Sequence, residues 1–192
     1  VNFFKERLTT ALALREKLFD KPYYRLVFGE SDGLPGLVID RFGSVLSVQI
    51  NTAGIEQRKE ALLAALVELF NPVAIILKND NSQRQLEGLS LESEIAYGQL
   101  PGTLVIEENG AQFKIDILDG QKTGWFYDHR SSRALLASIA KNQRVLDLFS
   151  YTGAWGIPAA KAGASEVTCV DASEGALSLA LENAQLNQVE DK

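Results

Sequence analysis

Two aspartates in the second half of the chain stand where an open sheet binds its ligand. Asp147 lies in the apolar run 144–149, and Asp171 directly follows a second run, 166–170. A predicted helix over 155–162 separates the two runs, so they are expected to be parallel strands of one sheet. Ligands of such sheets bind beyond the carboxyl ends of the strands. The two acids therefore indicate one site, for a ligand with hydroxyl groups or positive charge.

The turn that follows the first strand argues against a dinucleotide as the ligand. A dinucleotide fold would carry Gly-x-Gly-x-x-Gly here, because its first glycine allows a tight turn beside a pyrophosphate. Tyr151 occupies that first position, and its side chain is expected to disfavour the turn. S-adenosylmethionine has no phosphate and carries a sulfonium and an ammonium group. We therefore predict this cofactor, with Asp147 facing its amino group, Gly153 admitting close backbone approach and Asp171 accepting from its ribose.

Each of these residues also has a purely structural explanation. An acid at a strand end is often a helix cap or a surface charge, and Phe149 could simply belong to the core. Pro158 is tolerated only near the first turn of the helix, where its missing N–H has no intrahelical partner anyway. The spacing of Asp147 and Asp171 makes the pair more specific than either acid alone.

Two more helices and a hairpin complete the predicted second half. Helices are expected over 131–140 and 174–186, so the order strand, helix, strand, helix indicates the beginning of a doubly wound α/β sheet. Upstream, the runs 104–107 and 112–118 flank Glu108-Asn109-Gly110, and Asn-Gly between alternating apolar residues is a strong hairpin signal. We place this hairpin at the junction of two domains.

The first half of the chain is predicted to be an α+β domain. An amphipathic helix over 3–19 is followed by the order strand, strand, helix, strand, strand, over 36–40, 45–50, 55–70, 73–78 and 94–97. The segment 23–35 is rich in Gly, Asp and Pro and is interpreted as a loop. The prediction is a central α+β domain over residues 1–118, with the hairpin, and the first half of a Rossmann-like α/β sheet over 119–192.

Composition narrows the classes of function. The net charge of -6 weighs against unaided binding of a phosphate backbone, which depends on clustered lysine and arginine. The single cysteine excludes an internal disulfide and a multi-cysteine zinc site, and no metal is expected. Without an apolar run of roughly 18 residues or a secretory start, the protein is expected to be cytoplasmic, with no membrane contact. The absence of methionine indicates that Val1 does not follow a native initiator.

Three segments resemble the signatures of one known family. Residues 25–41, 120–130 and 147–153 are similar, in this order, to signatures of the bacterial 23S rRNA (cytosine-C5) methyltransferases, the large-subunit methyltransferase I-like family. The resemblance implies a PUA RNA-binding domain, a small central α+β domain and a C-terminal methyltransferase domain. Here the PUA domain would be absent and the methyltransferase domain cut off. The implied cofactor is S-adenosylmethionine, and the implied partner is 23S rRNA.

The resemblance also implies which residues contact the cofactor. His129, the only histidine, stands where the family usually has Gln, and we interpret it as a local packing or hydrogen-bonding change rather than a catalytic residue. The residues carried over to the cofactor site are Lys122, Thr123, Gly124, Asp128, Arg130, Asp147, Phe149, Ser150, Tyr151, Thr152, Gly153, Asp171, Ala172 and Ser173.

Cys169 is the one candidate nucleophile, because methylation at C5 of a pyrimidine requires a cysteine thiolate to add to C6. It lies inside a predicted strand, where a thiol is usually buried and inert. The resemblance places the reactive cysteines after later strands, downstream of Lys192. We therefore expect no catalytic residue in this chain and no methyl transfer by it alone. We also expect at most weak cofactor binding by the chain, with either self-association through the open sheet edge or loose order after Lys141.

Two alternatives remain open. The enzyme could methylate another RNA base or position, within the same family. Alternatively, the central domain could act as an RNA- or protein-binding module through the segment 23–35.

Overall fold

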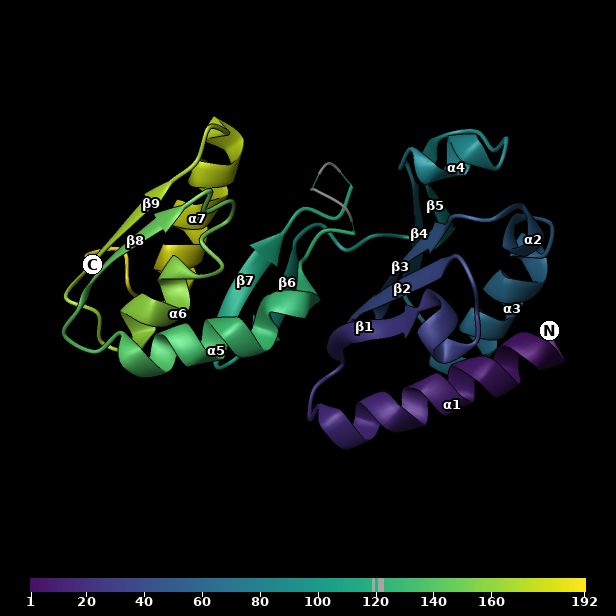
Figure 1. Cartoon of the computed structure of the whole chain (residues 1–192), viewed down its shortest axis with the longest axis horizontal. Coiled ribbons are helices and arrows are strands. Elements are labelled where there is room, and N and C mark those ends of the chain that lie inside the picture. Colours follow the sequence, from purple (N-terminus) through teal and green to yellow (C-terminus); the bar gives the residue numbers. More distant parts are fainter. Residues whose placement is uncertain (119, 121–122) are drawn as a thin grey trace. The chain divides into compact units, whose positions relative to one another are not determined.

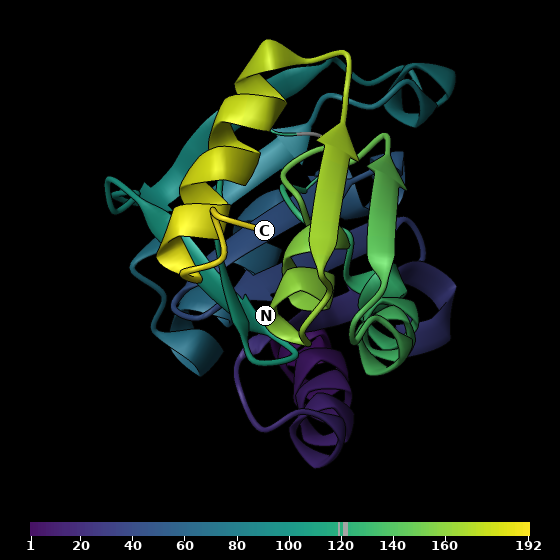
Figure 2. The same cartoon turned by 90° about the vertical axis from the view of Figure 1, so that its left-hand side faces the viewer.

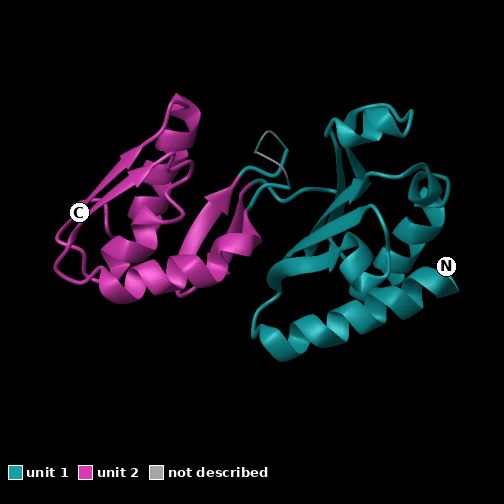
Figure 3. Cartoon of the chain, in the orientation of Figure 1, with its two compact units in different colours: residues 1–102, 116–125 teal, residues 103–115, 126–192 magenta. Residues whose placement is uncertain are grey.

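The computed structural model describes residues 1–118, 120 and 123–192 (Figure 1). The chain divides into two compact units (Figure 3). Unit 1 comprises residues 1–102 and 116–125, and unit 2 comprises residues 103–115 and 126–192. The chain therefore passes from one unit to the other three times.

Unit 1 is built on a five-stranded sheet in the order β1-β2-β3-β4-β5. Strands β3 and β4 are parallel, and the other neighbours are antiparallel. The strands are β1 (Tyr23–Phe28), β2 (Leu37–Phe42), β3 (Val45–Ile50), β4 (Ala74–Asn79) and β5 (Glu92–Gly98). The helices are α1 (Asn2–Leu18), η1 (Gly29–Asp32), α2 (Ala53–Glu56), α3 (Lys59–Phe70) and α4 (Gln83–Leu86).

One face of this sheet forms the hydrophobic core of unit 1. Leu8 of α1 and Leu62 of α3 are fully buried, in one cluster with strand residues such as Ile39, Val48 and Leu77. Because side chains alternate along a strand, the neighbours of these strand residues point to the other face. The amphipathic helices predicted from spacings of three and four are therefore present and cover a single face.

The prediction of a loop over 23–35 is wrong. The segment contains β1 and η1, and β1 is the strand that borders β2. The Gly, Asp and Pro residues lie after the strand, where Asp32 accepts from the backbone N–H of Phe28 (2.7 Å) and from Arg15 Nη2 (2.8 Å). The prediction failed because the turn residues in 29–35 outweighed the β-type run Tyr-Tyr-Arg-Leu-Val-Phe in 23–28.

The second face of the sheet carries buried polar residues. Asp40, fully buried, accepts from Arg25 Nε (2.9 Å) and Nη2 (3.0 Å) and from the hydroxyl of Thr123. Lys78, also buried, donates to the backbone carbonyl of Leu118 (2.6 Å). Both contacts hold parts of the segment 116–125 to unit 1, because a buried charge is stable only when it is paired or hydrogen-bonded.

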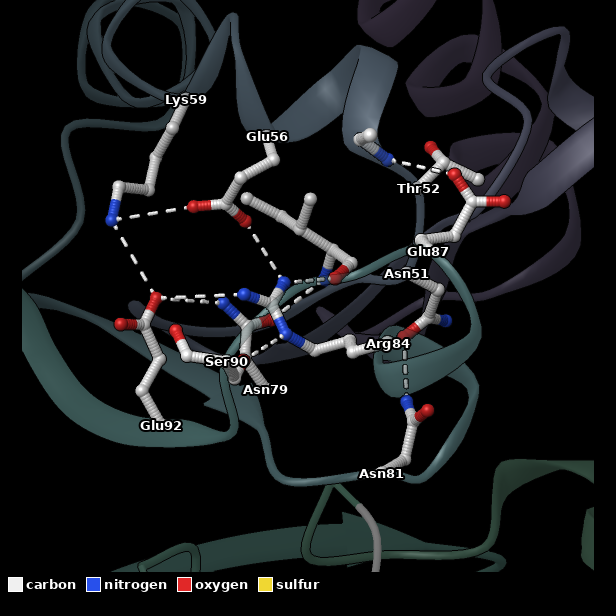
Figure 4. A network of polar contacts seen from close by, with 12 residues as sticks. Asn51, Thr52, Glu56, Lys59, Asn79, Asn81, Arg84, Glu87, Ser90 and Glu92 are labelled. Atoms are coloured by element: carbon white, nitrogen blue, oxygen red, sulfur yellow. Dashed lines mark hydrogen bonds and ion pairs between the residues drawn. The ribbon is translucent and has the colours of Figure 1, made fainter.

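A polar network closes the carboxyl ends of β3 and β4 (Figure 4). Arg84, which is 1% exposed, donates to the carbonyl of Ile50, to Glu56 Oε2 (2.8 Å) and to the carbonyl of Ser90 (2.8 Å). Asn79 accepts from the backbone N–H of Ile50 (2.8 Å). These groups satisfy one another, so the network is structural: it fixes the excursion between β4 and β5 to the sheet.

Replacing Arg84 should therefore destabilise the protein. Arg84→Gln leaves the buried carbonyl of Ile50 and the carbonyl of Ser90 without their donor and removes the charge that pairs with Glu56, and a buried acceptor left unsatisfied costs about 1–3 kcal/mol. We expect this loss in urea-induced unfolding of the protein. The exposed Arg58, in Arg58→Gln, is the matched control and should change stability by no more than about 0.5 kcal/mol. Equal effects of the two variants would contradict the structural role of the network.

Unit 2 contains a hairpin and a parallel strand pair (Figure 2). The hairpin is formed by β6 (Leu104–Glu108) and β7 (Ala111–Ile115), and the parallel pair by β8 (Arg144–Leu148) and β9 (Glu166–Val170). The helices are η2 (Tyr127–His129), α5 (Arg130–Ile139), α6 (Gly156–Lys161) and α7 (Glu174–Leu186). The predicted order of strand, helix, strand, helix is present, and its two strands are parallel.

The hairpin belongs to unit 2, whereas the predicted first domain, residues 1–118, includes it. Glu108 of β6, buried, accepts from Arg133 Nε (2.7 Å) and Arg130 Nε (3.3 Å), both on α5. These ion pairs join the hairpin to the first helix of the α/β part. The predicted boundary after residue 118 separates domains that fold independently. The division into compact units does not test independent folding, so this boundary stays a prediction.

Candidate functional site

The parallel register of β8 and β9 brings the two predicted loops together. Asp147 is opposite Cys169, and Leu148 is opposite Val170. The backbone N–H of Ser150 then donates to the carbonyl of Val170 (3.0 Å), beyond the last pair. Residues 149–153 and 171–173 therefore lie side by side at the carboxyl end of the strand pair, as predicted.

Asp147 fixes the start of α6. It is 8% exposed, and its Oδ2 accepts from the backbone N–H of Gly156 (3.0 Å). Burial raises the pKa of Asp147; the bond from Gly156 opposes this, and the charge of Asp171 adds to it. A Cβ on Gly156 would lie only 2.8 Å from Cys169 Sγ, so the helix start must be a glycine. The helix-capping role considered for this acid is thus present.

The turn between β8 and α6 has an unusual backbone. Phe149, Tyr151 and Gly153 have positive φ values of 59°, 47° and 78°. Left-handed conformations are uncommon for residues with a side chain, and they concentrate at functional sites. Tyr151 thus enters a tight turn that its side chain was expected to disfavour. A Cβ on Gly153 would lie 2.9 Å from Ile157 Cδ1, so this position has no room for a side chain.

Asp171 holds this turn from the second strand. Its Oδ2 accepts from the backbone N–H of Tyr151 (2.8 Å), and its Oδ1 accepts from that of Ser173 (3.0 Å). The bonds from Ser173 and Tyr151 lower the pKa of Asp171, so the carboxylate is ionised at neutral pH. Each carboxylate oxygen has a second lone pair, which can accept from a ligand hydroxyl. Ser173 Oγ in turn caps α7 by accepting from Ala176 N (3.2 Å).

The other turn residues alternate between solvent and interior. Phe149 is 89% exposed, so the alternative that it belongs to the core is wrong; Ala172 is also exposed. Ser150 and Thr152 are buried, and among the described residues Thr152 Oγ1 has no hydrogen-bond partner. Ser150 Oγ has no conventional partner there either, although it lies close enough to Cys169 to lower the pKa of the thiol. The turn thus exposes the ring of Phe149 to solvent, while its backbone is held by Asp171.

A row of aromatic rings flanks the turn. The ring of Phe126 lies 6.3 Å from Tyr151 and 6.5 Å from His129, and His129 lies 5.6 Å from Trp155. His129 Nε2 is 3.8 Å from a carboxylate oxygen of Asp128. These contacts are the local packing expected for His129, and none of them suggests a role in catalysis.

The segment before β8 is divided between the two units. Thr123 and Gly124 are buried in unit 1, where the Thr123 hydroxyl donates to Asp40. Asp128 and Arg130 lie in unit 2: Asp128 is exposed, and Arg130 is bound to Glu108. Lys122 lies outside the described residues. A cofactor role for these five residues stays a prediction.

Cys169 is a poor nucleophile. Burial raises the pKa of its thiol to about 11; the nearby Asp147 adds to this, and the Ser150 hydroxyl partly opposes it. The side chain is half-buried between β9 and the start of α6. Since only the thiolate attacks carbon, Cys169 is almost entirely unreactive at neutral pH. This supports the interpretation of Cys169 as a structural residue.

The pH dependence of alkylation tests this environment. The raised pKa means that the thiolate fraction of Cys169 keeps rising about tenfold per pH unit between pH 7 and 10. Iodoacetamide should therefore modify it on the order of 100-fold more slowly at pH 8 than a free thiol of pKa near 8.5. Glutathione, measured beside it, should approach its plateau near pH 9.5. A plateau for Cys169 at the same pH would show that its pKa is not raised.

Within residues 1–118 and 123–192, no three or more His, Cys, Asp or Glu side chains are placed to hold a metal ion. None of the helices in these ranges combines the length and the apolar character that crossing a bilayer requires.

Fold and site together define a class. A parallel strand–turn–helix unit, with an ionised acid after its second strand, is the arrangement at which open α/β sheets bind their ligands. A family model described as "S-adenosylmethionine-dependent methyltransferase" matches residues 88–191. The chain belongs to this family of S-adenosylmethionine-dependent methyltransferases, which confirms the predicted cofactor class.

Relatives in two bacteria carry the same name. The "Ribosomal RNA large subunit methyltransferase I" of Escherichia coli O139:H28 is 42% identical over 99% of this chain and 49% of the relative. That of Shigella dysenteriae serotype 1 is 41% identical over the same shares. The chain thus spans about half the length of the curated relatives it matches.

Solved structures agree with this assignment. A Streptococcus mutans protein described as a SAM-dependent methyltransferase is 27% identical, with a TM-score of 0.84 over 98% of this chain and 49% of that one. A methyltransferase structure complexed with SAH gives 27% identity and a TM-score of 0.85 over the same shares. The Methanocaldococcus jannaschii tRNA m1G37 methyltransferase shares the fold, with 20% identity and a TM-score of 0.64 over 98% of this chain and 50% of that one.

Asp171 should be the residue on which cofactor affinity depends most. Asp171→Ala removes the predicted acceptor for the ribose and the acceptor that holds the Tyr151 N–H. In the full-length protein, calorimetry should show at least a tenfold weaker affinity for S-adenosylmethionine. Glu174→Ala removes an exposed acid three residues away and should leave the affinity within about twofold. Unchanged binding by the Asp171 variant would remove this residue from the site.

Proposed function

We propose that the chain is the cofactor-binding part of an enzyme that methylates C5 of a cytosine in 23S rRNA. The observation that carries the proposal is the turn 149–153, held by Asp171 and followed by a helix whose first N–H is bound by Asp147. It stands in a chain 42% identical to proteins named ribosomal RNA large subunit methyltransferase I. The proposed partner is accordingly 23S rRNA, and the proposed compartment is the cytoplasm.

The residues of the turn fit S-adenosylmethionine. Asp171 is ionised and retains lone pairs for the ribose hydroxyls, and the missing side chain of the buried Gly153 lets the turn pack closely on Ile157. Asp147, bonded to Gly156, contributes negative charge beneath the turn, which favours the cationic methionine end. When bound, the cofactor supplies an electrophilic methyl group. The protein's own part here is to bind and orient it.

The nucleophile that C5 methylation requires is proposed to lie outside this chain. The raised pKa of Cys169 argues against that role at neutral pH, and it is the only cysteine in the sequence. The full-length enzyme is therefore expected to use a cysteine downstream of residue 192. Its Cys169→Ser variant should retain full activity.

The direct test is methyl transfer by the full-length protein. Labelled S-adenosylmethionine and unmodified 23S rRNA should give 5-methylcytidine, identified by mass spectrometry of the digested RNA. Methylation of another base would support the alternative within the same family. If no base of the RNA is methylated, the proposal is refuted. Loss of turnover in Cys169→Ser, with the fold retained, would show that the nucleophile had been misassigned.

A further inference from the structure

Helix α7 and its C-cap residue bury two asparagines on the face turned toward β7. Asn183 is 0% exposed and Asn187 is 8% exposed, and they are separated by one helical turn. Amide side chains are costly to bury unless their donors and acceptors are paired. Both residues therefore need specific partners, and the described contacts provide them.

The partners are backbone groups on the free edge of the hairpin. Asn187 Oδ1 accepts from Gln112 N (2.9 Å), and its Nδ2 donates to the carbonyl of Gln112 (2.6 Å). Asn183 Oδ1 accepts from Lys114 N (2.6 Å), and its Nδ2 donates to the carbonyl of Lys114 (3.2 Å). Each amide thus binds one residue of β7 as a neighbouring strand would.

The spacings of the two elements match. Four residues of α-helix rise about 6 Å, and two residues of an antiparallel strand span about 6.8 Å. Two asparagines four positions apart can therefore meet two residues of β7 that are two positions apart, Asn183 with Lys114 and Asn187 with Gln112. The N–H and C=O groups of these two strand residues point to the same side. The pair of asparagines satisfies the strand edge without a further strand.

The two asparagines differ in their remaining hydrogen bond. Nδ2 of Asn187 also donates within its own helix, to the carbonyl of Asn183 (2.8 Å). Nδ2 of Asn183 instead donates to the carbonyl of Thr152 (3.2 Å), in the turn between β8 and α6. Asn183 alone of the two connects the hairpin to that turn.

This bond completes the support of the turn. Asp171 holds the N–H of Tyr151 from one side, and Asn183 holds the carbonyl of Thr152 from the other. The two groups flank the residues with left-handed φ values at positions 151 and 153. A backbone in such conformations persists only where its surroundings fix it.

We propose that Asn183 is a positioning residue for the cofactor: it fixes the turn 150–153 against β7 in the conformation that binds S-adenosylmethionine. The proposal rests on the proposed cofactor site, because Asn183 acts on the ligand through the turn. A preformed turn removes an ordering cost from binding, so its loss weakens affinity.

Asn187 supplies a matched control for the test. Both Asn183→Ala and Asn187→Ala leave the N–H and C=O of one β7 residue without partners, so similar losses of stability are expected in urea unfolding. In the full-length protein, calorimetry should show at least fivefold weaker binding of S-adenosylmethionine for Asn183→Ala and a change within twofold for Asn187→Ala. If the two variants weaken binding equally, the effect is general destabilisation and the proposal fails.

A second measurement separates this proposal from the proposed function. Hydrogen exchange of the amides at 151–153 should be at least fivefold faster in Asn183→Ala than in wild type, and unchanged in Asn187→Ala. Should the wild-type protein not bind S-adenosylmethionine, the cofactor proposal fails, and exchange alone decides whether Asn183 holds the turn. Equal exchange in wild type and Asn183→Ala refutes the positioning role. If Asn183→Ala does not fold, Asn183→Ser replaces it in both measurements with the same expectations.

Discussion

The turn between β8 and α6 is the constraint on which unit 2 depends. The chain must reverse there within a few residues, and it does so through left-handed conformations at Phe149, Tyr151 and Gly153. Such a backbone is held only by groups outside the turn. Those groups are the carboxylates of Asp147 and Asp171, near the ends of β8 and β9, and the amide of Asn183 on α7. The strand pair, the start of α6 and the hairpin are therefore all connected through this short segment.

The same carboxylates that shape the turn are those expected to meet the ligand. Each carboxylate oxygen of Asp171 accepts a hydrogen bond from a backbone N–H, and these bonds keep the carboxylate ionised. Asp147 is buried beneath the turn and keeps the helix close to the strands. At Asp171 the structural role therefore leaves room for the proposed ligand-binding role. A carboxylate that anchors the backbone is already oriented for a second acceptor contact.

Local sequence patterns were enough to predict the parallel strand pair, its helices and the hairpin. They missed β1, because the turn residues after Phe28 masked the strand before it, and they did not reveal that Phe149 is exposed. They also missed Asn183, since its partner Lys114 lies 69 residues away along the chain. A signal was present: polar residues at 183 and 187 interrupt the apolar face that includes Ala180. Propensity alone does not identify the partner of such a residue.

The hairpin and the helix that pairs its backbone groups are synthesised at different times, because they are far apart in the sequence. The bonds between Gln112 and Asn187 join residues 75 positions apart, so β7 leaves the ribosome long before α7 exists. At about 5–20 residues per second, its edge waits roughly 4 to 15 s for its amide partners. An unpaired strand edge is a template for association with other chains. During synthesis, the edge of β7 therefore stays open to such association until α7 has been made.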